Sequence, residues 1–523
     1  MESISSRAIG LLAMSFVIIY VIQKALNARK HLASVGFHPG ARMVVSQASP
    51  LANLLPPVPG VIDGRNHMFR NKFDRYAEHG WDIIANFSLF PNEININVAN
   101  AAAIKEITSS RARFPKLVDY YKVLQMFGSN IVASEGELWK KCRKIASPAF
   151  NDRNNKLVWD ETIRIVLDLF DNVWMNKDVE VDHVLDVTLP ITLFVISVAE
   201  FGQRISWKDD TILPPGHKLT FKEALSVVSE DVLIKVSCPD ALLGATERLR
   251  RVKSAFEELD NYMLEMINER RHAEKKEERY DLFSSLLEAN DLPTNDEEVP
   301  LTERELMGNI FIFLLAGHET AGHTLAYTFG LLAFYQEEQE ILYQHIRSII
   351  PDSRTPTYEE MPLFTQSLAV LYETLRLFPS VCGIPKVSAE DTTLVAENAA
   401  GETKVVPIPQ GTGITLSVAG LHYNPKYWKD PHEFKPSRFR ENWPRDAFLP
   451  FSGGARACIG RKFFETEGIA ILAILISKYK ISLKEEPQFA GETIEEKKAR
   501  IFATKAGLTI SPIRMPLVFT RRT

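Results

Sequence analysis

One cysteine of the chain stands in a run of residues that favours chemistry over packing. The stretch FSGGARACIG (451–460) surrounds Cys458 with three glycines and Arg456. Glycines are costly in ordered backbone unless the chain turns sharply or approaches a neighbour closely. A helix is predicted to begin just after Gly460, and a cysteine beside a helix N-terminus and an arginine is expected to have a lowered pKa. A thiolate in such a turn, beside a residue that binds carboxylates, suits a haem with an axial thiolate.

A second candidate site lies in a long apolar stretch. The sequence AGHET (316–320) places Glu319 and Thr320 side by side. An acid and a hydroxyl in a dry pocket can pass protons. Ala316 and Gly317 remove side-chain bulk, which would let a flat molecule approach the helix. The alternative is a helix that packs against a neighbour at Gly317 and whose Glu319 is paired with an arginine.

A third feature is the sequence ETLR, in which Glu373 and Arg376 are three residues apart and share a helix face. An exposed ion pair of this kind contributes little to stability. The flanking leucines predict burial instead, and a buried pair needs further hydrogen-bond partners. The stretch PHEFKPSRF (431–439), predicted as an ordered irregular segment, offers Arg438 as a third member.

In this order, these segments resemble those of the cytochrome P450 family. WKKCR resembles the W-x-x-x-R of the helix that meets a haem propionate, which carries over Trp139 and Arg143. AGHET looks like the oxygen-activation stretch, ETLR like the E-x-x-R, and KPSRF like the P-E-R-F of the family. The resemblance covers nearly the whole chain beyond residue 55 and is closest to microsomal, fungal members. The haem signature F-x-x-G-x-R-x-C-x-G is matched at every fixed position: Phe451, Gly454, Arg456, Cys458 and Gly460.

The resemblance implies a role for each matching residue. Cys458 would be the proximal ligand of the haem iron, and Thr320 with Glu319 would manage water and protons at the distal oxygen. Three residues would hold the haem propionates: Arg456, Trp139 and Arg143. A structural triad would support the cysteine loop: Glu373, Arg376 and Arg438.

The sequence departs from the family pattern at a few positions. Lys386 stands where a propionate-binding arginine is usual, and it could still bind as a point charge. Ala321 replaces a second hydroxyl residue after the threonine, so the distal water network is expected to be simpler. Ser437 stands where glutamate is common, and Ala455 where proline is frequent. None of these changes removes a catalytic element.

The elements that must position these residues are predicted to be mostly helical. Thr302 and Glu305 form a capping-box pattern, and an apolar helix is predicted from there to about Tyr335. A second helix, FTQSLAVLYETLRLF, should stop at Pro379. The runs GITLSVA and GLTISPI predict short strands. We therefore expect a mainly α fold with a minor β component, the cytochrome P450 fold, preceded by a transmembrane helix.

The N-terminus carries the signal for that anchor. Residues 8–23 hold no charge and come close to the length that spans a bilayer, and Lys24, Arg29 and Lys30 follow. The positive-inside rule then leaves the rest of the chain on the cytosolic side. A cleaved secretory signal is the alternative, but its small-residue cleavage pattern is missing. The predicted division is an anchor over 1–26, a linker with a proline-rich hinge over 27–60 and a haem-thiolate catalytic domain over 61–523.

Composition narrows the classes of partner. The chain has 523 residues, of which 45% are apolar, enough for a large buried core. Its net charge of −5 argues against nucleic acid as a partner. The four cysteines are far apart and form no C-x-x-C, so we expect neither a disulfide framework nor a structural zinc site. Reduced thiols fit a cytosolic compartment.

The leading functional hypothesis is a monooxygenase that uses O₂ and electrons from NADPH. The chain has no flavin or nicotinamide fingerprint, so NADPH–cytochrome P450 reductase is the expected partner. We expect this protein at the endoplasmic reticulum membrane, with a single-pass anchor and a cytosolic catalytic domain. A non-catalytic haem protein such as a sensor is disfavoured because it has no need of Glu319 and Thr320. A haem-thiolate isomerase or dehydratase that uses no O₂ is disfavoured by the retention of Thr320.

The substrate is predicted from residues that the resemblance places around the distal pocket. They are mostly bulky and apolar, which predicts a lipophilic substrate, most plausibly a terpenoid or sterol-like compound of a biosynthetic pathway. A fatty acid or a xenobiotic is the alternative. The predicted lining residues are Val118, Tyr120, Tyr121, Phe127, Phe311, Leu315, Val381 and Ile384.

Overall fold

The computed structural model of the chain describes residues 6–522 except 48, 50–54, 203, 205–206, 208–212, 273–280, 292–299 and 353. For 6–13, 233 and 237 it describes the backbone only. The chain divides into two units, and each is described by itself. Unit 1 comprises Met1–Leu117, Cys382–Pro431 and Arg445–Arg456. Unit 2 comprises Val118–Val381, His432–Pro444 and Ala457–Thr523.

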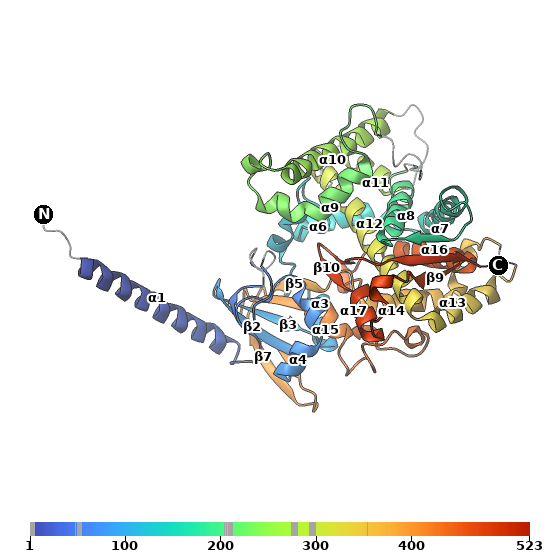
Figure 1. Cartoon of the computed structure of the whole chain (residues 1–523). Helices are drawn as coiled ribbons and strands as arrows, with labels where there is room; N and C mark the ends of the chain where they lie inside the picture. The colour runs from blue at the N-terminus through green and yellow to red at the C-terminus, as the bar shows by residue number, and fades with distance from the viewer. Residues whose placement is uncertain are drawn as a thin grey trace. The chain divides into compact units, whose positions relative to one another are not determined.

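Unit 1 contains a five-stranded sheet with the order β1-β2-β3-β8-β5 (Figure 1). β2 and β3 are antiparallel, and β3 pairs in parallel with β8, with Ile96 beside Ile414. Both isoleucines are fully buried. Because the β3–β8 pair joins distant parts of the chain, local sequence pattern alone does not encode it. The strands are β1 (Arg42–Val45), β2 (Ile83–Phe90), β3 (Glu93–Val98), β8 (Gly413–Ser417) and β5 (Gly383–Val387).

Helices and one hairpin complete unit 1. α5 begins at its N-cap Asn100, whose side chain accepts a hydrogen bond from the backbone N–H of Ala103, as an N-cap asparagine commonly does. α5 contacts the short turn η9 (Gly454–Arg456), which is part of the glycine-rich motif. The other elements are α1 (Ser6–Ser34), α3 (His67–Asn71), α4 (Asp74–His79), α5 (Ala101–Ser109), α15 (Val418–His422), η8 (Arg445–Ala447) and the hairpin of β6 (Thr392–Glu397) and β7 (Thr403–Ile408).

Unit 2 is predominantly helical and carries two small sheets (Figure 1). The order of its larger sheet is β4-β12-β9, and β10 and β11 form an antiparallel hairpin. The strands are β4 (Val179–Val181), β9 (Tyr479–Leu483), β10 (Thr504–Ala506), β11 (Ile510–Pro512) and β12 (Leu517–Arg521). The longer helices are α6 (Gly136–Ala146), α7 (Asp152–Asp168), α8 (Leu185–Ala199), α9 (Phe221–Ser237), α10 (Glu247–His272), α11 (Leu282–Asp291), α12 (Glu303–Phe334), α13 (Gln336–Ile349), α14 (Thr365–Leu377), α16 (Arg461–Lys478) and α17 (Ile494–Ile501). Short helical turns include η1 (Val118–Leu124) and η7 (Pro436–Arg440).

The long helix α12 is the central element of unit 2. The predicted capping box is present: the Thr302 side chain accepts from the Glu305 N–H, and the Glu305 carboxylate accepts from the Thr302 N–H. Most residues of α12 between Leu306 and Ala333 are buried, and the helix packs against α8, α10, α11, α14 and α16. A helix that is apolar on every side is stable in water only when neighbours cover it in this way. The predicted buried helix is therefore confirmed.

Other predicted elements are also confirmed. α14 ends at Leu377, before Pro379, and α16 begins directly after Gly460. The runs GITLSVA and GLTISPI supply β8 and β11. The result is a mainly helical fold with a minor sheet component.

The proline-rich segment of the predicted hinge forms a turn. Val58 and Ile62 pair across a turn, in which the Val58 N–H donates to the Ile62 carbonyl at 2.8 Å. The turn also joins the sheet region, since the Val45 N–H of β1 donates to the Val61 carbonyl at 2.8 Å. Backbone hydrogen bonds that the proline residues cannot make are thus supplied by their neighbours.

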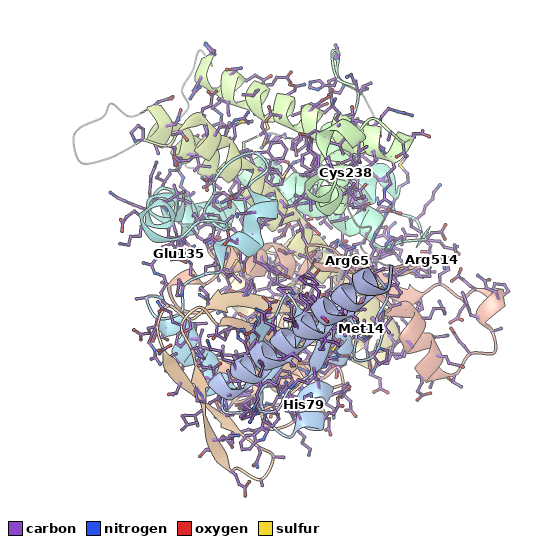
Figure 2. All side chains as sticks on the ribbon, turned by 90° about the vertical axis from the view of Figure 1, so that its left-hand side faces the viewer. Met14, Arg65, His79, Glu135, Cys238 and Arg514 are labelled. Atoms are coloured by element: carbon purple, nitrogen blue, oxygen red, sulfur yellow. The ribbon has the colours of Figure 1, made fainter. Side chains whose placement is uncertain are left out.

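The predicted anchor forms helix α1, on which Met14 is labelled in Figure 2. The apolar side chains from Met14 to Ile22 are exposed. In the part of the chain that the structure describes, no helix has both the length and the apolar character needed to cross a membrane. The side chains of residues 8–13, which belong to the predicted anchor, lie outside that part, so the transmembrane helix stays a prediction.

Candidate active site

Cys458 lies in unit 2, three residues before Arg461, the first residue of α16. It is a free cysteine and is exposed. The backbone next to it is fixed by α6: the Arg143 guanidinium donates to the Ala457 carbonyl at 3.2 Å. The exposed cysteine therefore lies just before a helix N-terminus, in a loop that Arg143 braces.

The predicted lowering of the Cys458 pKa is wrong for this chain by itself. Although part of its surface is open, the thiol is surrounded by enough protein that burial raises its pKa. Backbone N–H groups of Gly460 and Arg461, together with the charges of Arg143 and Arg461, act in the opposite direction and are outweighed. The desolvation of the thiolate therefore costs more free energy than these groups supply by stabilising it.

The glycines of the motif have a neighbour that the sequence did not identify. In unit 1, Gly454 has a φ of +62°, and a Cβ there would lie 2.1 Å from the backbone oxygen of Thr108 in α5. A Cβ on Gly453 would lie 3.1 Å from the Thr108 hydroxyl. By contrast, a Cβ on Gly460 would make an ordinary contact, 3.9 Å from the Cys458 sulfur. The close approach at Gly454 is thus to helix α5.

The remaining motif residues divide between the two units. Arg456 is half-buried in η9, and Phe451, half-buried, precedes it. Lys386 is buried in β5, opposite Ile414 of β8. These three belong to unit 1 together with Gly454, whereas Trp139, Arg143, Cys458 and Gly460 belong to unit 2.

Trp139 and Arg143 are on one face of α6, because they are four residues apart. Trp139 is buried, and Arg143 makes the contact with Ala457 described above. The two residues that resemble a W-x-x-x-R pair therefore place a cation against the carbonyl that precedes Cys458.

A short stretch of α12 is accessible although most of the helix is buried. Ala316 is exposed and Thr320, one turn later, is half-exposed. The Thr320 hydroxyl donates to the Ala316 carbonyl at 2.7 Å, which fixes its orientation. Gly317 faces α8 instead, since a Cβ there would lie 2.1 Å from the Ile196 Cδ1. The packing alternative is therefore correct for Gly317, while Ala316 and Thr320 offer a small open face.

Glu319 is buried and its partner is a threonine. The Thr509 hydroxyl, next to strand β11, donates to Glu319 Oε1 at 2.8 Å, so the arginine expected in the packing alternative is not what pairs with it. Burial raises the pKa of Glu319 to about 7, and the hydrogen bond from Thr509 acts in the opposite direction. A carboxyl group with such a pKa is present in both protonation states near neutral pH.

His323, one turn after Glu319, extends this group. Its Nδ1 is 2.8 Å from Thr509 Oγ1. Burial lowers the pKa of His323 to about 3, so the ring is neutral. Sequence reasoning missed both Thr509 and His323. The only sequence signal was the strand prediction for GLTISPI, which does not single out a threonine.

The structure brings Glu373, Arg376 and Arg438 together. Glu373 and Arg376, both on α14, are fully buried. Arg376 binds the Glu373 carboxylate through Nε at 2.6 Å and Nη2 at 2.8 Å. Arg438 Nε donates to Glu373 Oε1 at 3.1 Å, as does the backbone N–H of Lys435 at 2.9 Å. Arg376 also donates to the Glu433 carbonyl at 3.0 Å. The triad therefore holds η7 and the residues before it against α14.

These residues fit the haem that the sequence suggests. Unit 2 offers an exposed cysteine in a braced loop for the iron, and an accessible face of α12 at Ala316 and Thr320. α12 and α16 are in contact, so the helix with the open face packs against the helix that follows the cysteine. The described residues contain no group of three or more His, Cys, Asp or Glu that could hold a metal ion.

Comparisons with known proteins show what the chain is similar to. The family model described as "Cytochrome P450" matches residues 64–507. The chain is 50% identical to "Cytochrome P450 monooxygenase 124" of Postia placenta over 98% of this chain and 99% of that protein. It is 28% identical to "Cyclooctat-9-en-7-ol 5-monooxygenase" of Streptomyces melanosporofaciens over 72% of this chain and 78% of that one. The crystal structure of the cytochrome P450DA heme domain shares the fold, with a TM-score of 0.72 at 23% identity over 93% of this chain and 98% of that chain.

Proposed function

The chain belongs to the cytochrome P450 family and is a haem-thiolate monooxygenase, and from that premise we propose that Cys458 is the axial ligand of its haem. Bound haem supplies the chemistry of O₂ binding and O–O cleavage, to which an axial thiolate contributes electron density. The observation that carries the assignment is the exposed residue Cys458 just before α16, with its loop braced by Arg143. The other three cysteines lie outside any comparable turn.

The residues that the family resemblance assigns to the haem propionates are proposed to bind them. Arg143 and Arg456 carry the fork of donors that suits a carboxylate, and Trp139 shares the α6 face with Arg143. Lys386 would contribute a point charge in place of a fork. Glu373, Arg376 and Arg438 are proposed to act by position only, because their side chains bind one another and the backbone of residues 433–435.

Thr320 and Glu319 are proposed to deliver protons on the distal side. The Thr320 hydroxyl is aimed by its bond to the Ala316 carbonyl and lies on the open face of α12. Glu319, which precedes Thr320 in the sequence, is buried. It can exchange a proton near neutral pH, because its pKa is raised to about 7. A positioned acid with a pKa near the working pH is efficient in general acid catalysis.

The substrate is proposed to be lipophilic, with a terpenoid or sterol-like skeleton. Among the predicted lining residues of unit 2, Phe127 and Phe311 pack at 4.6 Å between ring centroids, and Leu315 is buried one turn after Phe311. Rigid aromatic walls favour a compact ring system over an extended chain. The relative named for cyclooctat-9-en-7-ol supports an unsaturated alcohol of this kind. Fatty acids remain the second class to test.

We also propose a single-pass anchor in the endoplasmic reticulum membrane, a cytosolic catalytic domain and NADPH–cytochrome P450 reductase as electron donor. The exposed apolar residues of α1 from Met14 to Ile22 support the anchor, since such a surface is unfavourable in water. Lys24, Arg29 and Lys30 follow it and favour the cytosolic side. Fractionation of cells expressing the full chain or residues 27–523 tests this, and an unchanged membrane fraction in the shorter chain would contradict it.

The decisive experiment for the haem ligand is the reduced carbon-monoxide difference spectrum. We expect the thiolate-type Soret band in the wild type and in Cys238→Ala, the matched control, and its loss in Cys458→Ala. A Cys458→Ala protein that keeps the band would overturn the assignment. For substrate, the chain, the reductase and NADPH are incubated with terpenoid, sterol and fatty-acid panels, and products that gain one oxygen only from fatty acids would refute the proposed class.

A further inference from the structure

We propose that Thr509 and His323 form a proton relay that returns a proton to Glu319 after each proton delivery. The inference rests on the proposed function, in which Glu319 supplies protons on the distal side. It adds two residues that belong to none of the recognised sequence motifs. Three side chains are involved, from α12 and from the hairpin of β10 and β11, and all lie in unit 2.

The geometry is a continuous chain of hydrogen bonds. Glu319 Oε1 is 2.8 Å from Thr509 Oγ1, which is 2.8 Å from His323 Nδ1. The direct distance between Nδ1 and Oε1 is 3.9 Å, too long for a hydrogen bond, so the hydroxyl is the link. All three side chains are buried, which keeps bulk water from competing for these bonds.

Counting donors shows that the relay has two states, which differ in where its protons lie. When Glu319 is ionised, the Thr509 O–H donates to Oε1, and the hydroxyl oxygen must accept from a His323 Nδ1–H. When Glu319 is protonated, its O–H can donate to Thr509 Oγ1, and the Thr509 O–H then donates to an unprotonated Nδ1. Both states satisfy Glu319 Oε1, Thr509 Oγ1 and His323 Nδ1.

Conversion between the states carries one proton. The Nδ1 proton of His323 moves to Thr509 Oγ1 while the Thr509 proton moves to Glu319 Oε1, and a hydronium ion gives a proton to Nε2 of the same ring and becomes water. The imidazole is neutral before and after and has only changed its tautomer, and the net result is Glu319 protonated at the expense of the hydronium ion. The low pKa of His323 suits this role, because a ring that stayed charged would keep both protons.

The charged and titratable groups around the relay come from several elements. Glu230 of α9 raises the pKa of Glu319, and Lys505 of β10 lowers it. His318, Lys505 and His183 lower the pKa of His323. None of them is hydrogen-bonded to Glu319, so Thr509 is the direct partner that connects the carboxyl group to a second titratable residue.

A purely structural role is the competing explanation, since the same bonds would tie the hairpin to α12. The hairpin has other attachments, however. The Ile510 N–H donates to the Ser380 carbonyl at 3.0 Å, and the Ser380 hydroxyl is 3.1 Å from that of Thr324 in α12. Removal of the Thr509 hydroxyl should therefore leave the hairpin in place, which makes the two roles separable by mutation.

The test compares Thr509→Val, Thr509→Ser and His323→Asn in the haem-loaded full chain, with Thr504→Val of the same hairpin as the matched control. The first readout is the infrared titration of the Glu319 carboxyl band, identified by its loss in Glu319→Gln. We expect a midpoint near the wild-type value in Thr509→Ser and Thr504→Val. In Thr509→Val the midpoint should move upward, because the hydrogen bond that favours the carboxylate is gone.

The second readout uses NADPH, O₂ and NADPH–cytochrome P450 reductase without added substrate. We expect NADPH consumption to fall about 10-fold in Thr509→Val, with more hydrogen peroxide released per NADPH, and to recover in Thr509→Ser. His323→Asn can still donate to Thr509 but cannot change tautomer, so the relay predicts that it is as slow as Thr509→Val. Wild-type consumption in His323→Asn, or an unmoved carboxyl midpoint in Thr509→Val, would overturn the relay. Loss of the thiolate-type carbon-monoxide band in the wild type would instead refute the proposed function.

Discussion

The substitution Gly454→Ala separates two reasons for the glycine in the cysteine motif. The structure gives Gly454 a φ of +62° and places any Cβ 2.1 Å from the backbone oxygen of Thr108. Backbone atoms of a helix cannot move aside as the end of a flexible side chain can. We therefore expect the variant to be destabilised by its contact with α5.

The magnitude follows from two contributions. Holding a residue with a Cβ in the left-handed region costs about 1–2 kcal/mol. Forcing atoms into a packed contact costs about 1–3 kcal/mol more. The free energy of unfolding should fall by roughly 2–5 kcal/mol in total.

Two further glycines of unit 1 provide matched controls. Gly401 has a φ of +81° and no atom within 4 Å of its Cβ position, so Gly401→Ala should show only the conformational cost. Gly453→Ala brings a Cβ to 3.1 Å from the Thr108 hydroxyl, a longer approach than the 2.1 Å at Gly454, and should be milder than Gly454→Ala. Urea unfolding of the three haem-loaded variants, followed by circular dichroism, measures the differences.

The comparison with Gly401→Ala shows whether the contact with Thr108 adds to the conformational cost. A Gly454→Ala protein as stable as Gly401→Ala would refute the argument from Thr108. If that protein had also lost its haem, the glycine would be required at the cofactor instead of at α5.

Other parts of the structure make equally direct predictions. Glu373→Gln should cost about 3–5 kcal/mol in urea unfolding, since a fully buried carboxylate with four hydrogen bonds is replaced, whereas Glu137→Gln in an exposed pair should cost about 0–1 kcal/mol. Gly317→Ala should lower the melting temperature, and adding Ile196→Val should restore part of it because that change deletes the clashing Cδ1; no restoration would contradict the contact. Burial lowers the pKa of His217, but hydrogen bonds to two carboxylates of α10 outweigh burial and raise it. This stabilisation is present below the unfolded-state pKa and lost as pH rises through the folded one, so melting temperature should fall over that range in the wild type and less in His217→Gln.

Much of the fold follows from local sequence pattern. The capping box at Thr302 and the apolar residues after it are enough to predict α12, because helix formation depends on residues three and four positions apart. The break before Pro379 and the start of α16 after Gly460 are local for the same reason. The β3–β8 pairing could not be predicted, since nothing in either strand specifies a partner in a distant part of the chain.

The candidate site also combines features that the sequence predicts with features that depend on tertiary packing. The sequence offered Arg438 only as a candidate partner of Glu373, whereas the hydrogen bond itself depends on how η7 lies against α14. The raised pKa of Cys458 could not be predicted either, because it reflects the balance between burial and the nearby charges. Residue types fix which groups could be ionised, and packing sets the free energy of ionising them.

The sequence by itself determined the chemistry that this protein can offer: a single cysteine in a glycine-rich turn, an acid next to an alcohol in an apolar helix, and a glutamate and an arginine on one helix face. Only the tertiary structure decided which neighbours these groups have. The backbone of Thr108 lies where a Cβ on Gly454 would be. Thr509 is hydrogen-bonded to both Glu319 and His323. The physical reason is that hydrogen bonds and steric contacts act over a few ångströms in space, whereas Glu319 and Thr509 are 190 residues apart in sequence.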